Sequence, residues 1–403
     1  MKICHVSYHA ASGGGAIAAM RLHRALKGQG ADSVFLAVEP DNCPDAISIA
    51  TTWERKKLLW KQRLLWRLYQ LQHSRNFTAH SFDVLPSGFV PRILAHKPDV
   101  VHLHVVNGEM LSIGEIAELS RRVKLVWTLH DSWPFCGTEQ HPRSDGNDRY
   151  IHGYTRENKE DPGIDFDRRV WEHKARSWDA RNFHFIAPSH WIGTMMKNSR
   201  IFADSPMRVI GNTLDTAVFL PMDRIAVRRR LGLPADKFLI GFGASSLTDI
   251  NKGGNELAAI LGHLAAKTHG RVELATAGNG AMYSPIKVNP LGYIDSEPAM
   301  AAFYQSCDLF LLPSKYDNLP NMILESMACG TPVAAFDTGG IGDMVKPDCG
   351  LLAPAFDSKR LAEMILAYID SNAKLDAAAR SHIESNYSPP IIAKAHQDLY
   401  HSC

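Results

Sequence analysis

Two carboxylates flank the start of a predicted helix between residues 311 and 340. This segment reads LLPSKYDNLPNMILESMACGTPVAAFDTGG: an apolar strand ends at Pro313, a helix follows, and a second strand begins near residue 332. Asp317 lies in the turn before the helix, and Glu325 lies eight residues further on, inside it. Backbone amides at a helix N-terminus can hold a pyrophosphate, and the two carboxylates could bind sugar hydroxyls on either side of it. The alternative is that Glu325 is only a polar residue of a buried helix.

Residues of catalytic type also follow predicted strands elsewhere. His130 and Asp131 directly follow an apolar strand, at the sheet edge where α/β proteins bind ligands. A histidine in that position is more often structural than functional, and Asp131 either orients the imidazole or caps the turn. Lys252, taken alone, would be a solvated surface lysine.

A glycine-rich turn after the first strand allows a rival interpretation. Gly13, Gly15 and Ala18 fit a loose G-x-G-x-x-A pattern, and Glu39 ends the second strand as a ribose-binding acid would. That pattern is typical of NAD enzymes. Residues 9–12, however, lengthen the turn beyond the tight dinucleotide form, and an NAD site leaves the acidic pair of the second half unexplained.

Short apolar runs alternate with helical stretches along the whole chain, which predicts parallel sheets flanked by helices. The expected strands are 3–7, 33–38, 100–105, 125–129, 183–187, 238–242, 271–275, 308–312 and 332–336. The expected helices include 16–28, 112–121, 254–268, 298–306 and 320–329. A turn-rich stretch, 210–222, separates two such series. We therefore predict two doubly wound α/β domains that face each other across a cleft, residues 1–210 and 211–403, with a terminal helix near 390–400 crossing back to the first domain.

Composition narrows the class of protein. The 403 residues carry a net charge of +2, which gives no general attraction to nucleic acid. The seven cysteines are scattered without metal-ligand spacing, as expected of reduced thiols. The N-terminal apolar run is too short for a signal peptide, and no stretch reaches the ~18 apolar residues of a membrane span. We expect a cytoplasmic protein, at most peripheral to the inner face of the cell membrane.

Two stretches break the α/β pattern. The segment Trp53–Asn76 is basic and rich in tryptophan, with seven Lys/Arg and one acidic residue. If it is helical, Leu58, Leu65 and Tyr69 share one face, and a basic stripe lies roughly opposite. Such a helix either binds an anionic membrane or is an ordinary surface helix packed by its leucines. The second stretch, Thr138–Asp167, is a polar segment of about thirty residues, of the kind that is usually functional or disordered.

The chain resembles the family 4 retaining glycosyltransferases, which have the two-Rossmann architecture called GT-B. The run ESMACGTPV at 325–333, preceded by Asp317, is similar to the signature of that family. GGGA at 13–16, WTLHDSWP at 127–134, APSHW at 187–191 and Lys252-Gly253 extend the resemblance over nearly the whole chain. The forms around His130 and Asp317 are most similar to members that build colanic acid and related exopolysaccharides.

The resemblance implies transfer of a sugar from a UDP- or GDP-sugar to a saccharide acceptor, lipid-linked or polymeric, during synthesis of cell-surface polysaccharide. It implies that Glu325 binds the ribose, that Asp317 binds the donor sugar, and that Lys252 neutralises the diphosphate. It further implies a donor contact for His130, beside Asp131. The remaining residues of the expected donor site are Gly14, Gly15, Ser245, Ser246, Tyr293, Asn318, Leu319 and Pro320.

This sequence departs from the family pattern at two points. The family usually has Glu where Asp317 stands, and an arginine a few residues before the lysine, where residues 243–246 read GASS. We expect one cation, serine hydroxyls and backbone amides to stabilise the leaving group, with no metal and no cofactor. A nucleotide-sugar 2-epimerase of the same architecture and a non-catalytic nucleotide-sugar-binding protein remain as alternatives.

Overall fold

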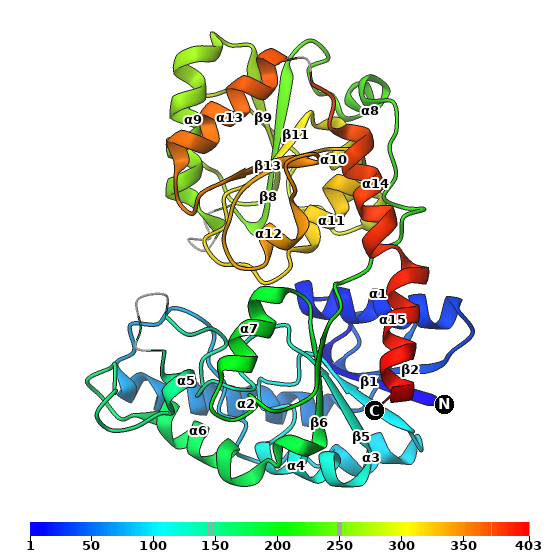
Figure 1. The fold of residues 1–403 in the computed structure, drawn as a ribbon, viewed down its shortest axis with the longest axis vertical. Helices are drawn as coiled ribbons and strands as arrows, with labels where there is room; N and C mark the ends of the chain where they lie inside the picture. Colours follow the sequence, from blue (N-terminus) through cyan, green and yellow to red (C-terminus); the bar gives the residue numbers. More distant parts are fainter. Residues whose placement is uncertain (144–145, 147, 248–251, 372, 403) are drawn as a thin grey trace. The chain divides into compact units, whose positions relative to one another are not determined.

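The computed structural model describes residues 1–143, 146, 148–247, 252–371 and 373–402 (Figure 1). The chain divides into two compact units. The first unit contains Met1–Asn212 and Ile392–Cys403, and the second contains Thr213–Ile391. The boundary expected from the sequence, after residue 210, lies two residues earlier.

The first unit is built on a parallel sheet of seven strands in the order β3-β2-β1-β4-β5-β6-β7. The strands are β1 Lys2–His9, β2 Asp32–Glu39, β3 Ala46–Ser48, β4 Val100–Leu103, β5 Lys124–Thr128, β6 Phe183–Ala187 and β7 Met207–Val209. The helices are α1 Gly14–Gly28, α2 Thr52–Tyr69, α3 Val90–Ala95, α4 Ile113–Arg122, α5 Arg149–His152, α6 Phe166–Ser177, α7 His190–Asn198 and α15 Pro389–Ser402, with 3₁₀ turns at Gln70–Gln72 and Ala180–Asn182.

The second unit is built on a parallel sheet of six strands in the order β10-β9-β8-β11-β12-β13. The strands are β8 Phe238–Ser246, β9 Val272–Asn279, β10 Val288–Pro290, β11 Leu309–Leu312, β12 Val333–Phe336 and β13 Gly350–Ala353. The helices are α8 Arg224–Leu231, α9 Gly254–Thr268, α10 Glu297–Ser306, α11 Asn321–Ala328, α12 Ile341–Met344, α13 Ser358–Ser371 and α14 Asp376–Tyr387. The prediction of two doubly wound α/β domains is confirmed.

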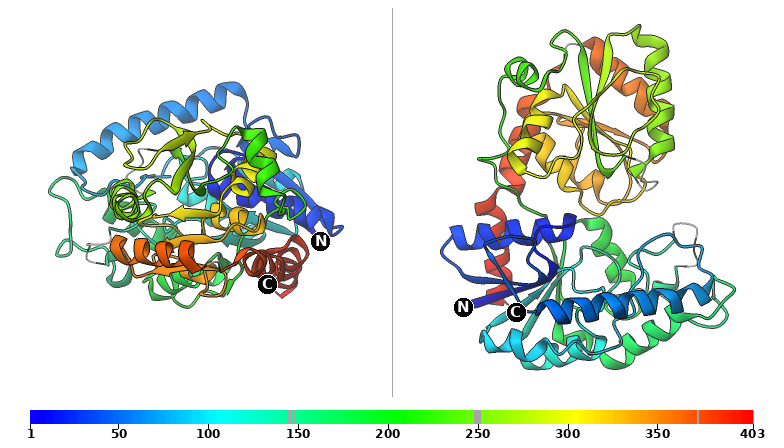
Figure 2. Two further views of the ribbon diagram at one scale, coloured as in Figure 1. Left: turned by 90° about the horizontal axis from the view of Figure 1, so that it is seen from above. Right: turned by 180° about the vertical axis from the view of Figure 1, so that it is seen from behind.

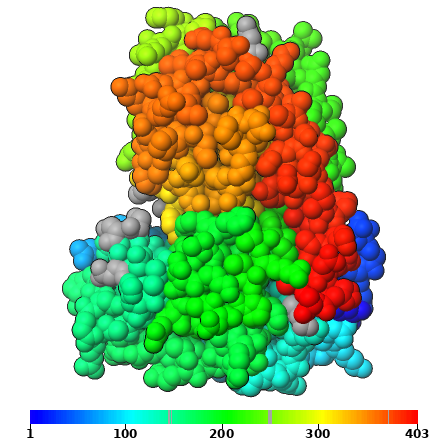
Figure 3. Space-filling model, in the orientation of Figure 1, coloured from blue at the N-terminus to red at the C-terminus, as the bar shows by residue number. Residues whose placement is uncertain are grey.

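Helices cover both faces of each sheet, because parallel strands that are apolar on both sides must be buried on both sides. In the second unit, α9 and α13 pack side by side on one face, and α10, α11 and α14 pack on the other (Figures 1 and 2). The outer side of α13, orange in the space-filling view, forms part of the surface of this unit (Figure 3). In the first unit, α1 and α15 share one face, and Tyr400 of α15 lies fully buried against it.

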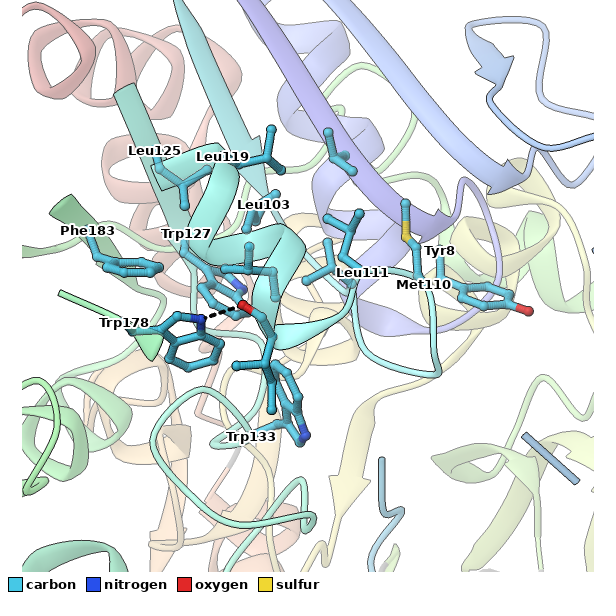
Figure 4. Close-up of a cluster of buried hydrophobic side chains, with 14 of the residues drawn as sticks. Tyr8, Leu103, Met110, Leu111, Leu119, Leu125, Trp127, Trp133, Trp178 and Phe183 are labelled. Atoms are coloured by element: carbon cyan, nitrogen blue, oxygen red, sulfur yellow. Dashed lines mark hydrogen bonds between the residues drawn. The ribbon is translucent and has the colours of Figure 1, made fainter. Parts of the chain in front are cut away.

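An aromatic cluster on the other face of the first sheet holds the segment that follows β5 (Figure 4). The indole of Trp178 donates to the carbonyl of Ile113 at 2.9 Å, and that of Trp133 donates to the carbonyl of Ser81 at 2.9 Å. The ring of Trp127 on β5 lies against both of these tryptophans. The turn after β5, which carries the candidate catalytic histidine, is therefore anchored in the core.

Candidate functional site

The strand order reverses direction once in each sheet, and several of the candidate residues follow the strands at these reversals. In the second sheet the reversal lies between β8 and β11; in the first it lies between β1 and β4. Ligands of doubly wound sheets bind beyond the carboxyl ends of the strands at such reversals. Lys252 and Asp317 follow β8 and β11, while Gly15 follows β1.

The second unit joins Lys252 and Asp317 in an ion pair. The Lys252 Nζ lies 2.8 Å from Asp317 Oδ2, and the two side chains are 30% and 19% exposed. The sequence placed both residues in one site, and the structure brings them into direct contact. A cation and a carboxylate therefore lie side by side, and both are partly accessible to solvent.

Two glycines fix this pair by closely approaching the turn after β11. Gly253 has a φ of +76°, and a Cβ there would collide with the carbonyl oxygen of Pro313. Gly339 has a φ of +58°, and a Cβ there would collide with the carbonyl oxygen of Asp317, which also accepts a hydrogen bond from the Gly340 amide at 3.0 Å. Only glycine permits both the positive φ and the contact. Sequence reasoning noted Lys252-Gly253 but missed Gly339.

Glu325 lies on α11 and is 7% exposed. Its Oε2 accepts a hydrogen bond from the hydroxyl of Tyr304 on α10 at 2.9 Å. Tyr304 is fully buried and was not singled out from the sequence. The Tyr304 hydroxyl gives this carboxylate a fixed position in the middle of α11. At the start of that helix, Pro320 is the N-cap, and Asn318 and Leu319 are also largely buried.

The other expected donor-site residues of the second unit are more exposed. Ser245 and Ser246 are the last two residues of β8 and face solvent. Tyr293 is 59% exposed in the segment after β10, a strand that lies two positions away from β8 in the sheet. The two serines therefore lie at the strand reversal, whereas Tyr293 follows β10, the edge strand of the sheet.

In the first unit the glycine loop packs against His130. A Cβ on Gly15 would lie 2.8 Å from Val105 and 3.0 Å from Cγ of His130. Gly14 is exposed at the first position of α1. The lengthened part of this turn is held by Asp41, whose Oδ2 accepts hydrogen bonds from the amides of residues 10, 11 and 12 at 2.9–3.2 Å.

His130 is oriented by a second histidine rather than by its neighbour Asp131. Its Nε2 lies 3.1 Å from Nδ1 of His104, and burial lowers the pKa of His130 to about 4. The Asp131 carboxylate instead accepts hydrogen bonds from the Trp133 amide at 3.0 Å and from Asn107 at 2.9 Å. Burial raises the pKa of Asp131 to about 6. The sequence left open whether Asp131 orients the imidazole or caps the turn; its hydrogen bonds are those of a turn cap.

Two clusters in the described residues have side chains at metal-ligand spacing, and most of their possible ligand atoms already have hydrogen-bond partners. In the cluster of His5, His102 and His104, both ring nitrogens of His102 and of His104 have hydrogen-bond partners. In the cluster of His80, Glu139 and Asp167, the hydroxyls of Tyr69 and Thr138 contact His80, and the hydroxyl of Tyr154 donates to Glu139. Asp167 accepts hydrogen bonds from the Thr138 hydroxyl and from the side-chain amide of Gln72.

Comparison with known proteins defines the family. The family model described as Glycosyltransferase Family 4 matches residues 12–218, and the model described as Glycosyl transferases group 1 matches residues 239–371. The chain belongs to Glycosyltransferase Family 4.

Three known proteins illustrate the similarity. The D-inositol 3-phosphate glycosyltransferase 1 of Catenulispora acidiphila is 30% identical over 44% of this chain and 47% of its own length, so the match spans about half of that relative. The putative colanic acid biosynthesis glycosyl transferase WcaC of Escherichia coli is 23% identical over 87% of this chain and 86% of its own. The structure of HepE from Anabaena, in complex with UDP-glucose, covers 100% of both chains with a TM-score of 0.66 and 17% identity, which shows a shared fold.

The contact between Gly253 and Pro313 leads to a first prediction. Gly253→Ala should lower the melting temperature more than Gly232→Ala does, because Gly232 also has a positive φ (69°) but a Cβ there meets no atom within 4 Å. The strain of a positive φ costs about 1 kcal/mol at either position, and only residue 253 adds the collision. Thermal unfolding of the two variants measures the difference; equal losses would contradict the proposed constraint.

Proposed function

We propose that this protein is a glycosyltransferase that moves a sugar from a nucleotide-sugar to a saccharide acceptor. The observation that carries the proposal is the Lys252–Asp317 ion pair at the strand reversal between β8 and β11. Asp317 of this pair lies in the same βαβ unit, β11–α11–β12, as Glu325, which Tyr304 holds in place. Membership of the family, the similarity to WcaC and the complex of HepE with UDP-glucose support this assignment.

The ion pair supplies a way to couple binding of the diphosphate to binding of the sugar. Because the pair is partly exposed, it is worth only about 0–1 kcal/mol, and breaking it costs little. A diphosphate attracts the Lys252 ammonium, which releases the Asp317 carboxylate to accept a hydrogen bond from the donor sugar. Glu325 binds the ribose hydroxyls while one of its oxygens stays on Tyr304.

We assign the remaining roles as follows: residues of the second unit bind the nucleotide-sugar, and residues of the first unit bind the transferring sugar and the acceptor. Ser245, Ser246 and the amides near Asn318, Leu319 and Pro320 add hydrogen bonds to the nucleotide-sugar, and Tyr293 contacts its outer part. Gly14, Gly15 and His130 bind the transferring sugar and the acceptor. Retention of configuration follows if the leaving phosphate oxygen takes the proton of the acceptor hydroxyl as that hydroxyl attacks the same face of the sugar.

A second prediction concerns charge neutralisation in this reaction. Lys252 and backbone amides should stabilise the leaving diphosphate without a divalent metal, so transfer should survive EDTA. Lys252→Ala should lower kcat by about 100-fold, as removal of one electrostatic donor does in other enzymes. Exposed Lys287, which pairs with Glu273, serves as the control and should be replaceable by Ala at little cost. Activity that EDTA abolishes and only Mg²⁺ or Mn²⁺ restores would refute this.

A third prediction separates the two carboxylates. Glu325→Gln should weaken the nucleoside diphosphate and the nucleotide-sugar by similar factors of about 10 to 100, because both carry the ribose and a hydrogen bond to a charged group is worth ~1.5–3 kcal/mol. Asp317→Asn should leave diphosphate affinity nearly intact and lower kcat, because its contact is made to the sugar.

Calorimetric titration with diphosphate and with nucleotide-sugar, beside steady-state rates, measures both effects. A purely structural role would instead lower the melting temperature of both variants and leave their kinetics normal at low temperature. The division of roles is wrong if Asp317→Asn weakens the bare diphosphate as much as Glu325→Gln does.

We also propose that α2 binds the surface of an anionic membrane, where a lipid-linked acceptor would lie. A capping box of Thr51 and Glu54 starts this helix, and Leu58, Leu65 and Tyr69 are its buried residues, as predicted from their spacing. The helix runs along the outside of the first unit (Figure 2). Its outward surface carries large apolar side chains that are 57–70% exposed: Trp53, Trp60, Leu64 and Trp66.

Basic side chains flank these aromatic rings. The Lys57 ammonium lies 5.8 Å from the ring of Trp53, and the Arg63 guanidinium lies 6.0 Å from that of Trp60. Exposed indoles next to lysine and arginine suit the interface between lipid headgroups and acyl chains. Every helix in the described part of the chain is too short or too polar to cross a bilayer.

A fourth prediction tests this surface. The triple variant Lys56→Glu, Arg63→Glu, Arg67→Glu should lose co-sedimentation with anionic vesicles, because each basic residue near such a surface contributes about 1 kcal/mol. Lys97→Glu, Arg121→Glu, Lys124→Glu changes the net charge equally elsewhere on the first unit and should still bind. Binding that is unchanged in the first variant, or lost equally in both, would contradict a role for α2.

A further inference from the structure

Three histidines form a hydrogen-bonded chain that leads from the core of the first sheet to His130. His5 lies on β1, while His104 and His130 follow β4 and β5, the next two strands of the sheet. Nδ1 of His5 lies 2.9 Å from Nε2 of His104, and Nδ1 of His104 lies 3.1 Å from Nε2 of His130. His5 is fully buried and His104 is 3% exposed.

This chain has only two possible arrangements of protons. Burial lowers the pKa of His5 and of His104 well below the usual value, and that of His130 to about 4, so all three rings are neutral near pH 7. A neutral imidazole has one N–H and one acceptor nitrogen. Both hydrogen bonds therefore point toward His130 or both point away from it.

The inner end of the chain decides between the two arrangements. Nε2 of His5 is buried without a hydrogen-bond partner, and the rings of Phe35 and His23 lie beside this imidazole. If the hydrogen bonds pointed away from His130, that nitrogen would carry a buried N–H with no acceptor, which is rare in folded proteins. In the other arrangement it carries only a lone pair. The hydrogen bonds thus point toward His130.

We propose that His104 and His5 are positioning residues that hold His130 with its proton on Nδ1, so that His130 meets its ligand as a hydrogen-bond donor. Identification of that ligand as a nucleotide-sugar, with a hydroxyl or phosphate oxygen as the acceptor, rests on the proposed function. The absence of a side chain at Gly15 leaves room for the His130 ring, because a Cβ there would lie 3.0 Å from its Cγ.

His102 lies beside the chain but does not compete for its two hydrogen bonds. The ring of His102 lies against that of His104, with centroids 4.2 Å apart and the planes tilted by 35°. Its own nitrogens are occupied by the hydroxyls of Tyr400 and Thr128, each at 2.7 Å. His102 therefore packs against the chain without joining it, and α15, which supplies Tyr400, helps to hold it there.

Nuclear magnetic resonance of ¹⁵N-histidine in the ligand-free full chain tests the tautomer directly. Wild type should show His130 with a protonated Nδ1 and a bare Nε2. His104→Phe removes the donor, and His130 should shift to the Nε2–H form that free histidine favours. His104→Asn should restore the Nδ1–H form, because its amide nitrogen replaces Nδ1 of His104. His396→Phe is the control: Nδ1 of His396 bonds to the carbonyl of Ile392 in its own helix, and its ring contacts His102 and Tyr400, which lie outside the hydrogen-bonded chain, so the His130 tautomer should not change.

Kinetics provide the second readout. His104→Phe should lower kcat about ten-fold with little change in KM, and His104→Asn should be close to wild type. The proposal is overturned if wild-type His130 carries its proton on Nε2, if His104→Phe leaves the proton on Nδ1, or if the tautomer changes while kcat does not. If His104→Phe fails to fold, the wild-type spectrum and the His104→Asn variant still show which nitrogen of His130 carries the proton. Lack of turnover by wild type with any nucleotide-sugar would refute the proposed function and leave the tautomer result standing.

Discussion

The close approach of Gly253 to the carbonyl of Pro313 is the constraint on which the site of the second unit depends. It brings the segment after β8 against the turn after β11, and so places the Lys252 ammonium 2.8 Å from the Asp317 carboxylate. Gly339 supports the same turn from the next strand connection. Because each contact involves backbone atoms, no side chain larger than hydrogen fits at either position without moving the turn. The two glycines therefore determine where the ion pair lies.

The candidate sites of the two units share a position in the fold, next to a strand reversal, but differ in the groups that line them. In each, a strand reversal leaves room beyond the carboxyl ends of two neighbouring strands. The second unit places charged groups there, which suits a diphosphate and sugar hydroxyls. The first unit places a neutral glycine loop there, after β1, and next to it, after β5, a neutral imidazole whose pKa burial holds at about 4. A neutral, oriented histidine suits hydrogen bonding to a sugar rather than neutralisation of charge.

The sequence predicted much of this arrangement, and the omissions have physical causes. All nine strands expected from apolar runs are present, and the four that were missed, β3, β7, β10 and β13, are the outer strands of the two sheets. Edge strands are short and partly exposed, so they lack a continuous apolar run. The family signature located Asp317, Glu325 and Lys252. It could not reveal Tyr304 or His104, because these meet their partners only through the packing of helices and strands that are distant in sequence.

Thermal unfolding in the presence of a panel of UDP-sugars, GDP-sugars and NAD measures whether the site binds a nucleotide-sugar. Ligand at about 100 times its Kd stabilises the folded state by about 2.7 kcal/mol, which raises the melting temperature measurably. We expect one nucleotide-sugar and its nucleoside diphosphate to raise the melting temperature of wild type. The diphosphate should have a much smaller effect on Lys252→Ala, and NAD should have none. A melting temperature that only NAD raises, or that no nucleotide-sugar of the panel raises, would contradict binding of a nucleotide-sugar at this site.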